Sequence, residues 1–203
     1  MASDKTTVNA SKKLSWLLRH GAAEAGIVLD QEGWASVAEV LRVLAMNRAQ
    51  FDRAVETNEK KRFDVDGDLV RACQGHSEGV GGVTLEALEQ SWEVLGDTDG
   101  IVWHGTHVDA LEGIAAEGIS SVSRTHVHLA STTDAKVGKR ANVDILLGVS
   151  LAALRSSGQT VWRSANGVVL VRHVPAAAIV ALASATKHGE KKLAWAKSLF
   201  SIL

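Results

Sequence analysis

The stretch 79–100, GVGGVTLEALEQSWEVLGDTDG, divides the chain, because it contains five acidic residues and no lysine or arginine. It begins and ends in the glycine-rich or acidic chemistry of turns, which is typical of a domain boundary. The spacing of apolar residues changes across it, from a helical rhythm to a mainly β rhythm. We therefore expect an α+β protein of two lobes, with a first lobe over 1–85, an acidic linker over 86–100 and a second lobe over 101–203.

The charge of the 203 residues is balanced overall but unevenly placed. A formal net charge of −1 argues against a uniformly basic nucleic-acid-binding protein. Residues 1–78 carry a net charge of −1, residues 79–100 of −5 and residues 101–203 of +5. A solvated acidic linker beside a mildly basic lobe explains this pattern, and so does a surface that handles anions. The charge distribution alone leaves both interpretations open.

The sequence contains no sign of export or membrane insertion. No stretch approaches the roughly 18 consecutive apolar residues of a membrane span, and the N-terminus lacks the apolar segment of a secretory signal. The only cysteine, Cys73, has no partner for an internal disulfide and cannot complete a thiolate metal site. These features suit a reducing compartment. We expect a cytoplasmic protein with no membrane partner.

The first lobe is expected to begin with an amphipathic helix that ends at Arg19 and His20. Ser11 can cap this helix, and Gly21 follows as a terminator. Its apolar face carries Leu14, Leu17 and Leu18. A basic side chain at a helix end has an ordinary explanation, since it compensates the terminal carbonyl groups.

Two more helices and a hairpin follow in the first lobe. The capping-box pattern Ser36-Val-Ala-Glu39 precedes apolar residues at helical spacing, and a third helix is expected over 48–60. The Asp66-Gly67 pair suits a tight turn between two short strands. Three helices followed by a hairpin is the element order of a winged helix, a small fold often used on nucleic acids. The apolar positions of the second and third helices are Val37, Val40, Leu41, Leu44, Phe51, Ala54 and Val55.

The second lobe is expected to be rich in strands. Residues 100–106 are predicted to form a short buried strand, after which Thr106 can cap a helix over 107–118. The alternation and composition of later segments predict further strands. These are the strands over 125–130, 143–150 and 176–184, and a hairpin over 161–174 that turns around Asn166-Gly167.

Three arginines lie where core packing does not require them. Arg19, Arg71 and Arg124 have no obvious carboxylate partner in the sequence. They suit phosphate recognition, because a guanidinium group holds two phosphate oxygens at once. No glycine-rich phosphate loop is present, so side chains would do much of the binding. Taken singly, Arg19 is better explained as an ordinary helix-end charge and Arg71 as an ordinary cross-strand charge.

The histidine patterns are less specific. His126 and His128 alternate on one face of a predicted strand, but a metal site needs a third ligand that the sequence does not identify. We predict no metal. His104 precedes Gly105 at a strand end. It is either a buried histidine with its own partners or a group that faces a ligand where glycine lets the backbone approach closely.

A set of short motifs, in this order and at these separations, resembles a known family: LSWLLRH, GW, RACQGHS, WHGT, SRTHVHL, VGKR and NGVVL. From about Ser11 to Ile179 the chain is similar to the NAD-dependent RNA 2′-phosphotransferases of the KptA type. The resemblance implies a winged-helix lobe that binds RNA and a lobe with the ADP-ribosyltransferase fold that binds NAD⁺. It also implies an enzyme of RNA repair or tRNA splicing that acts on an internal 2′-phosphate at a splice junction.

The resemblance implies a reaction in two steps. The RNA 2′-phosphate attacks C1″ of NAD⁺ and expels nicotinamide, which forms an ADP-ribosylated RNA. The ribose 2″-hydroxyl then attacks the phosphorus, which releases RNA with a 2′-hydroxyl and ADP-ribose 1″,2″-cyclic phosphate. Fixed cations lower both barriers, because each step places negative charge on a phosphate.

The residues of the site follow from the same resemblance. The catalytic set it implies is Arg19, His20, Arg71 and Arg124. The set expected to hold the RNA phosphate is Arg19, His20, Arg71, Gln74, His76 and Ser77. The set expected to bind NAD⁺ is His104, Gly105, Thr106, His128, Arg140 and Asn166. We expect Arg19 and Arg71 to hold the 2′-phosphate and Arg124 to stabilise charge in the second step, whereas the role of His20 stays open.

Two other functions are compatible with parts of the sequence. The same NAD chemistry can stop at ADP-ribosylation of a terminal phosphate of RNA or DNA, as some relatives can do. A winged-helix DNA-binding regulator is a third interpretation, although its second helix would offer only Arg42 and Arg48. Trp103 stands where a tyrosine is common in the family, and VGKRAN differs from the frequent basic-His-Gly continuation. We expect a monomer.

Overall fold

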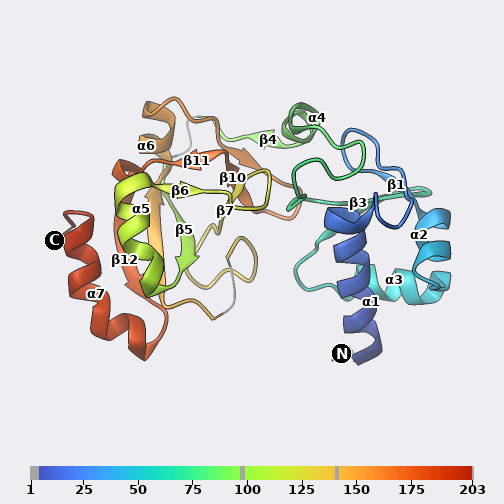
Figure 1. Ribbon diagram of the computed structural model, residues 1–203, viewed down its shortest axis with the longest axis horizontal. Helices are drawn as coiled ribbons and strands as arrows, with labels where there is room; N and C mark the ends of the chain where they lie inside the picture. The colour runs from blue at the N-terminus through green and yellow to red at the C-terminus, as the bar shows by residue number, and fades with distance from the viewer. Residues whose placement is uncertain (1–4, 97–98, 140–141, 203) are drawn as a thin grey trace. The chain divides into compact units, whose positions relative to one another are not determined.

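The computed structural model describes residues 5–96, 99–139 and 142–202 (Figure 1). Helices and small antiparallel sheets are mixed in it, which confirms the α+β class. The described residues form two compact units. The first unit contains those before Glu93 together with Ser123–Thr125, and the second unit contains the rest. No helix among the described residues is long and apolar enough to cross a membrane.

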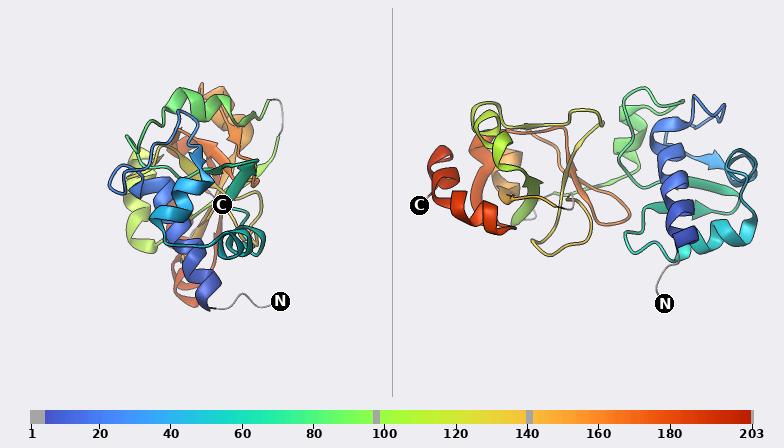
Figure 2. Two further views of the ribbon diagram at one scale, coloured as in Figure 1. Left: turned by 90° about the vertical axis from the view of Figure 1, so that its right-hand side faces the viewer. Right: turned by 60° about the horizontal axis from the view of Figure 1, so that its bottom comes forward.

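The first unit combines helices with a three-stranded sheet of order β1-β3-β2. Helices α1 and α3 pack together, and Figure 2 shows them in dark blue and cyan. Their leucine and phenylalanine side chains are fully buried, which confirms the apolar faces predicted for these helices. The elements are α1 (Lys5–Trp16), the π-helical turn η1 (Leu17–Gly21), β1 (Ala35–Ser36), α2 (Val37–Val43), α3 (Arg48–Glu56), β2 (Phe63–Asp66), β3 (Leu69–Ala72) and α4 (Leu85–Gln90).

The first helix begins earlier than its sequence pattern predicts. Helix α1 starts by Lys5, so the prediction that Ser11 caps it is wrong. The Ser11 hydroxyl instead accepts a hydrogen bond of 2.6 Å from the Asn58 side chain. Gly21 is not a left-handed terminator either, because the next residue keeps helical dihedral angles. A Cβ atom at Gly21 would overlap the ring of Trp16, so close packing explains this glycine.

The predicted second helix is confirmed as α2, but its predicted capping box is wrong. Ser36 precedes the helix without a side-chain hydrogen bond to it. The residue pairs with Leu69 in the sheet, and the next amide, of Val37, donates to the carbonyl of Asp68 at 2.8 Å. A capping box does form at the next helix, where Asn47 and Gln50 exchange two hydrogen bonds of 2.9 Å.

The predicted hairpin of the first unit is confirmed. Strands β2 and β3 pair from Phe63 with Ala72 to Asp66 with Leu69. The two-residue turn is therefore Gly67-Asp68, one residue later than expected, and Gly67 has the positive φ of 55° that such a turn requires. Side chains alternate between the two faces along each strand. The place of the candidate site residue Arg71 in β3 therefore decides the face of the hairpin on which its side chain lies.

Part of the acidic stretch is folded onto the first unit. Thr84 caps α4 through a hydrogen bond from the amide of Ala87, and Leu88 and Trp92 are buried. The Trp92 indole donates a hydrogen bond of 3.0 Å to the carbonyl of Cys73. Residues expected to be a linker thus contribute to the core, while the limits of the two lobes stay a prediction.

The second unit is built on small antiparallel sheets. Two of them have the orders β12-β8-β5 and β4-β9-β10-β7, and a bridge between Trp103 and Ala130 links β5 to the residue after β7. Figure 1 shows α7 packed along β12. The strands are β4 (Glu93–Val94), β5 (Ile101–Thr106), β6 (Ile119–Ser120), β7 (Val127–Leu129), β8 (Ile145–Ser150), β9 (Trp162–Arg163), β10 (Val169–Val171), β11 (His173–Val174) and β12 (Ile179–Ser184). The helices are η2 (Val108–Ala110), α5 (Leu111–Glu117), α6 (Leu151–Ser156), η3 (Ala176–Ala178) and α7 (Lys187–Leu199).

The predicted strands and the hairpin at Asn166-Gly167 are confirmed in this unit, but one cap is wrong. Thr106 is the last residue of β5 and pairs with Ile145, so its extended backbone does not begin the following helix. Helix α5 does end at Gly118, whose φ is 81°. The helices α6 and α7 were not predicted, although Ser150 and Thr186 cap them through their hydroxyl groups.

Candidate active site

Arg19 is a buried arginine in the π-helical turn η1. Its side chain is 8 % exposed and lies against Gly75, where an added Cβ atom would be 3.5 Å from the guanidinium carbon. The Nε and Nη2 atoms are buried and have no hydrogen-bond partner among the described residues. The pKa of Arg19 is lowered to about 10, mainly by burial and to a smaller extent by the charges of Arg62 and Arg124. A cation in this state is stabilised by any anion that reaches it.

His20 lies next to this cation and is oriented by a later loop. Its Nδ1 atom is 2.8 Å from the hydroxyl of Ser77. The Ser77 amide donates a hydrogen bond of 3.0 Å to the carbonyl of Arg19. Burial, followed by the charges of Arg19 and Arg124, lowers the pKa of His20 below its ordinary value. The lowered pKa favours the neutral imidazole, which has one donor and one acceptor nitrogen.

His76 is the most buried polar side chain of this region. It is 0 % exposed, and neither ring nitrogen has a hydrogen-bond partner among the described residues. A Cβ atom on Gly33 would lie 2.8 Å from its Nε2 atom, so a glycine makes room for the ring. Burial lowers the pKa of His76 to about 3, with smaller contributions from Arg19, His20 and Arg71. The ring is neutral, and its unused nitrogens make it a further hydrogen-bonding group for a ligand.

Arg71 has the carboxylate partners that its sequence neighbours did not reveal. Its guanidinium lies 3.1 Å from Glu32 and 3.3 Å from Asp64, and it stacks 4.5 Å above the ring of Trp34. The contact with Asp64 is the cross-strand pair that the sequence left open as one interpretation of Arg71. Its Nε atom is buried and has no partner among the described residues. The two carboxylates and the indole hold the planar group in one orientation.

The structure brings the four predicted catalytic residues into the first unit. The segment Ser123–Thr125 belongs to this unit, and the Thr125 amide donates a hydrogen bond of 3.1 Å to the carbonyl of His76. This contact places Arg124, which is exposed, close enough to lower the pKa of Arg19 and His20. Gln74, also predicted at this site, is buried in the same loop.

Arg62 was missed by the sequence reasoning. It precedes β2, is half-buried, and contributes to the lowered pKa of Arg19. The only sequence signal for it is the basic run Lys60-Lys61-Arg62 before an alternating strand, a pattern that most often marks a solvated surface. We call Arg19, Arg62, Arg71 and Arg124 the arginine cluster.

The residues predicted to bind NAD⁺ lie in the second unit, where the structure describes them. The Nδ1 atom of His104 on β5 lies 3.2 Å from the carbonyl oxygen of His128 on β7. Gly105 sits under the Val143 side chain, which a Cβ atom would approach to 3.0 Å, and Thr106 is buried. Thus His104, Gly105 and Thr106 form one strand end beside His128.

The other two residues predicted to bind NAD⁺ are Asn166 and Arg140, and His126 was considered as a metal ligand. Asn166 lies in the turn between β9 and β10, where its side-chain oxygen accepts a hydrogen bond of 2.9 Å from the Ser164 hydroxyl. Arg140 lies outside the described residues. His126 is buried in an edge-on contact with the ring of Trp162, at 5.4 Å. The described residues contain no group of three or more His, Cys, Asp or Glu side chains that could hold a metal ion.

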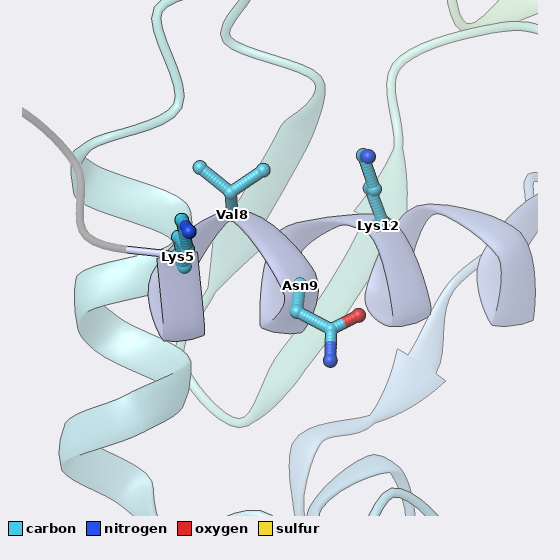
Figure 3. Close-up of a pocket in the computed structure, with 4 residues that line it drawn as sticks. All are labelled: Lys5, Val8, Asn9 and Lys12. Carbon is cyan, nitrogen blue, oxygen red and sulfur yellow. The ribbon is translucent and has the colours of Figure 1, made fainter.

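A shallow pocket lies away from these residues on the N-terminal part of α1 (Figure 3). It is lined by Lys5, Val8, Asn9 and Lys12 and measures about 270 Å³. None of the predicted site residues lines it. The chemistry of the first unit therefore rests on the arginine cluster with His20 and His76, an arrangement suited to binding a phosphate group.

Comparison with known protein families agrees with this chemistry. The model of the family described as "RNA 2'-phosphotransferase, Tpt1 / KptA family" matches residues 5–173. A relative from Pseudomonas syringae pv. tomato, named "Probable RNA 2'-phosphotransferase", is 38% identical over 175 residues, which cover 81% of this chain and 89% of the relative. Relatives of the same name from Rhizobium rhizogenes and Streptomyces griseus are 34% and 35% identical, over 86% and 85% of this chain and 94% and 95% of their own lengths.

Proposed function

Because the chain belongs to the RNA 2′-phosphotransferase (Tpt1/KptA) family, we propose that it removes an internal 2′-monophosphate from RNA and transfers it to NAD⁺. The products are RNA with a 2′-hydroxyl, nicotinamide and ADP-ribose 1″,2″-cyclic phosphate. The observation that carries the proposal is the buried guanidinium of Arg19, whose Nε and Nη2 atoms have no partner among the described residues. A buried cation with unused donors is costly, so it is best explained as a site that an anion completes.

The 2′-phosphate is proposed to bind to Arg19 and Arg71. Both have buried donor atoms available, and the carboxylates on Arg71 fix its orientation without using its Nε atom. His76, neutral and buried beside them, donates one hydrogen bond to a phosphate oxygen through its protonated ring nitrogen. Arg124 is proposed to stabilise the negative charge of the second step, since it is an exposed member of the arginine cluster.

NAD⁺ is proposed to contact the strand end formed by His104, Gly105 and Thr106. Because a carbonyl oxygen only accepts hydrogen bonds, His104 donates through Nδ1 to the carbonyl oxygen of His128, which fixes the orientation of its ring. An imidazole held in one orientation can bind a ribose by hydrogen bonding, so these residues fit the co-substrate. When bound, NAD⁺ supplies the electrophilic ribose carbon that receives the phosphate. We propose that His104, Gly105, Thr106, His128, Arg140 and Asn166 bind it.

The fold assignments and the cellular setting belong to the same proposal. We propose a winged helix for the first lobe and an ADP-ribosyltransferase fold for the second, in a monomeric cytoplasmic enzyme whose partner is RNA. The helix order and the β1-β3-β2 sheet of the first unit support the first assignment. A role as a DNA-binding regulator has less support, because Arg48 is engaged by Asp52 at 2.8 Å.

The test is to incubate the full chain with NAD⁺ and a short RNA that carries one internal 2′-phosphate, and to identify every product. We expect free nicotinamide, the cyclic phosphate of ADP-ribose and RNA with a 2′-hydroxyl. A persistent ADP-ribosylated strand, or modification of terminal phosphates alone, would identify the enzyme as a capping ADP-ribosyltransferase instead. No release of nicotinamide and no loss of phosphate would exclude both activities.

A matched pair of variants distinguishes the loss of a site arginine from the loss of a positive charge elsewhere on the chain. Arg19→Ala is expected to lower turnover at least tenfold, because a hydrogen bond to a charged group contributes about 1.5–3 kcal/mol. Arg42→Ala removes an equally charged but exposed side chain of α2 and is expected to leave turnover unchanged. Full activity of Arg19→Ala would remove Arg19 from the proposed site.

A further inference from the structure

Arg62 lies on the same face of the hairpin as Arg71. Its carbonyl accepts a hydrogen bond of 2.9 Å from the Cys73 amide, which continues the pairing of Asp64 with Arg71 by one more step. Because side chains alternate between the two faces of a strand, Arg62 and Arg71 point to the same side, away from the face that buries Val70. Diagonal neighbours across such a pair are about 7–8 Å apart at the backbone, which long side chains can span.

Hydrogen bonds of Asn58 connect Arg62 to helix α1, and Arg19 lies in the turn η1 that follows this helix. The buried Asn58 side chain donates to the Ser11 hydroxyl at 2.6 Å and accepts from the Arg62 amide at 3.3 Å. Its carbonyl also accepts a hydrogen bond of 2.8 Å from the Lys61 amide. One side chain therefore joins α1 to the loop before β2. Arg62 is held in place by both its main-chain groups rather than being part of a loosely attached surface loop.

Arg62 has no ion-pair partner among the described residues. Its side chain is half-buried and makes no ion pair or side-chain hydrogen bond with them, whereas Arg71 has two carboxylate partners. After burial, the charge of Arg62 is the next cause of the lowered pKa of Arg19, so the two cations lie near enough to repel each other. Neighbouring cations that repel each other form a site to which a second anion can bind favourably.

We propose that Arg62 binds the internucleotide phosphate on the 3′ side of the nucleotide that carries the 2′-phosphate. This inference rests on the proposed function. An internal 2′-phosphate always has a 3′-phosphodiester on the adjacent carbon of the same ribose, so the substrate presents two anions at a short, fixed separation. Arg19 and Arg71 then hold one anion and Arg62 holds the other. Arg62 thereby distinguishes an internal 2′-phosphate from a terminal one.

The experiment compares two RNAs that differ only in this second anion. Both carry one 2′-phosphate, either at an internal nucleotide or at a 3′-terminal nucleotide that ends in a free 3′-hydroxyl. Binding of each labelled RNA is measured by fluorescence anisotropy without NAD⁺, and turnover is measured with it. The proteins are the wild type, Arg62→Ala, Arg62→Gln, Arg62→Lys and the control Arg42→Ala. Circular dichroism and the melting temperature report folding, and Arg62→Gln keeps most of the packing if the alanine variant folds poorly.

We expect Arg62→Ala and Arg62→Gln to bind the internal RNA about tenfold more weakly than the wild type and the terminal RNA equally well, since one charge-assisted hydrogen-bonding group is lost. The salt dependence of binding to the internal RNA becomes shallower by about 0.7 in log–log slope. Arg62→Lys recovers part of the affinity, and Arg42→Ala changes nothing.

The inference would be overturned by an equal loss of affinity for both RNAs, by no loss for either, or by a change confined to the KM for NAD⁺. If the wild type turns over neither RNA, the proposed function fails, and the binding measurements still decide whether Arg62 recognises the second phosphate. A wild type that binds the two RNAs equally well also contradicts the inference.

Discussion

The Nδ1 atom of His20 lies 2.8 Å from the hydroxyl oxygen of Ser77, while the Ser77 amide donates a hydrogen bond to the carbonyl of Arg19. One serine, from a loop that is distant in sequence, therefore holds both members of the Arg-His pair. The amide contact fixes the main chain of the π-helical turn, and the hydroxyl contact orients the imidazole ring. The two contacts can be separated by mutation, because only the second uses the side chain.

Ser77→Ala is expected to lower kcat/KM for the RNA roughly fivefold with little change in stability. The variant keeps the amide contact to Arg19 and loses the hydroxyl contact to His20, which contributes about 1 kcal/mol. Steady-state kinetics and urea unfolding measure the two effects. Ser77→Thr, which retains a hydroxyl, serves as the control. An unchanged kcat/KM for Ser77→Ala would show that the orientation of His20 does not matter for the reaction.

Arg19→Met is expected to stabilise the ligand-free protein while abolishing most of its activity. Methionine has a similar length, fills the buried space and removes a cation whose donors have no partner among the described residues, a cost of about 1–3 kcal/mol. We expect a higher free energy of unfolding in urea and at least a tenfold loss of turnover. Inorganic phosphate should raise the melting temperature of the wild type but not that of the variant. A destabilised variant would contradict the interpretation of Arg19 as an uncompensated cation.

His76 makes stability depend on pH between its folded and unfolded pKa values. Burial lowers the folded pKa to about 3, whereas the ordinary value is 6.5, so the unfolded chain binds more protons within this window. The stabilisation is complete above pH 6.5 and is lost as the pH falls. His76→Gln lacks this dependence, so the stability difference between the two proteins should change by roughly 1.5–2 kcal/mol between pH 6.5 and 5. Parallel pH profiles from urea unfolding would show that the ring is protonated in the native state.

Gly33→Ala is expected to destabilise the protein more than Gly26→Ala. Both glycines have a positive φ, of 86° and 68°, which costs an L-residue about 1–2 kcal/mol. Only at Gly33 does the added Cβ atom collide with another group, the His76 ring at 2.8 Å, whereas no atom lies within 4 Å at Gly26. We expect Gly33→Ala to lose at least an additional 1 kcal/mol in urea unfolding, because the buried ring must move. Equal losses would indicate that His76 moves aside freely.

Trp34→Leu is expected to raise the KM for the RNA about fivefold, because the indole that supports the Arg71 guanidinium contributes about 1 kcal/mol. The ring lies 4.5 Å from the guanidinium carbon. Trp34→Phe keeps an aromatic face and should show a smaller effect. The KM for NAD⁺ is the internal control, since the residues proposed to bind NAD⁺ lie in the other unit. An equal rise in both KM values would point to a general loss of structure.

Structural features that depend only on residues close together in the sequence were predictable from the sequence. The leucine face of α1 follows from helical spacing, and the turns at Gly67 and at Asn166-Gly167 follow from the dihedral angles that glycine permits. The three wrong caps, at Ser11, Ser36 and Thr106, share one cause. Each residue matches a local capping pattern, but its backbone is already committed, to a longer helix in the first case and to a strand in the other two.

The candidate site was also predictable from the sequence only in part. The sequence by itself determined which residue types are available, and the motifs around Arg19, Arg71 and Arg124 were sufficient to indicate phosphate chemistry and the family. Only the tertiary structure decided which charges are compensated, because Glu32 lies far from Arg71 in sequence and meets it only through the fold. The role of Arg62 became visible for the same physical reason. The energy of a charge depends on burial and on neighbours in space, and neither quantity is encoded in the order of residues along a short motif.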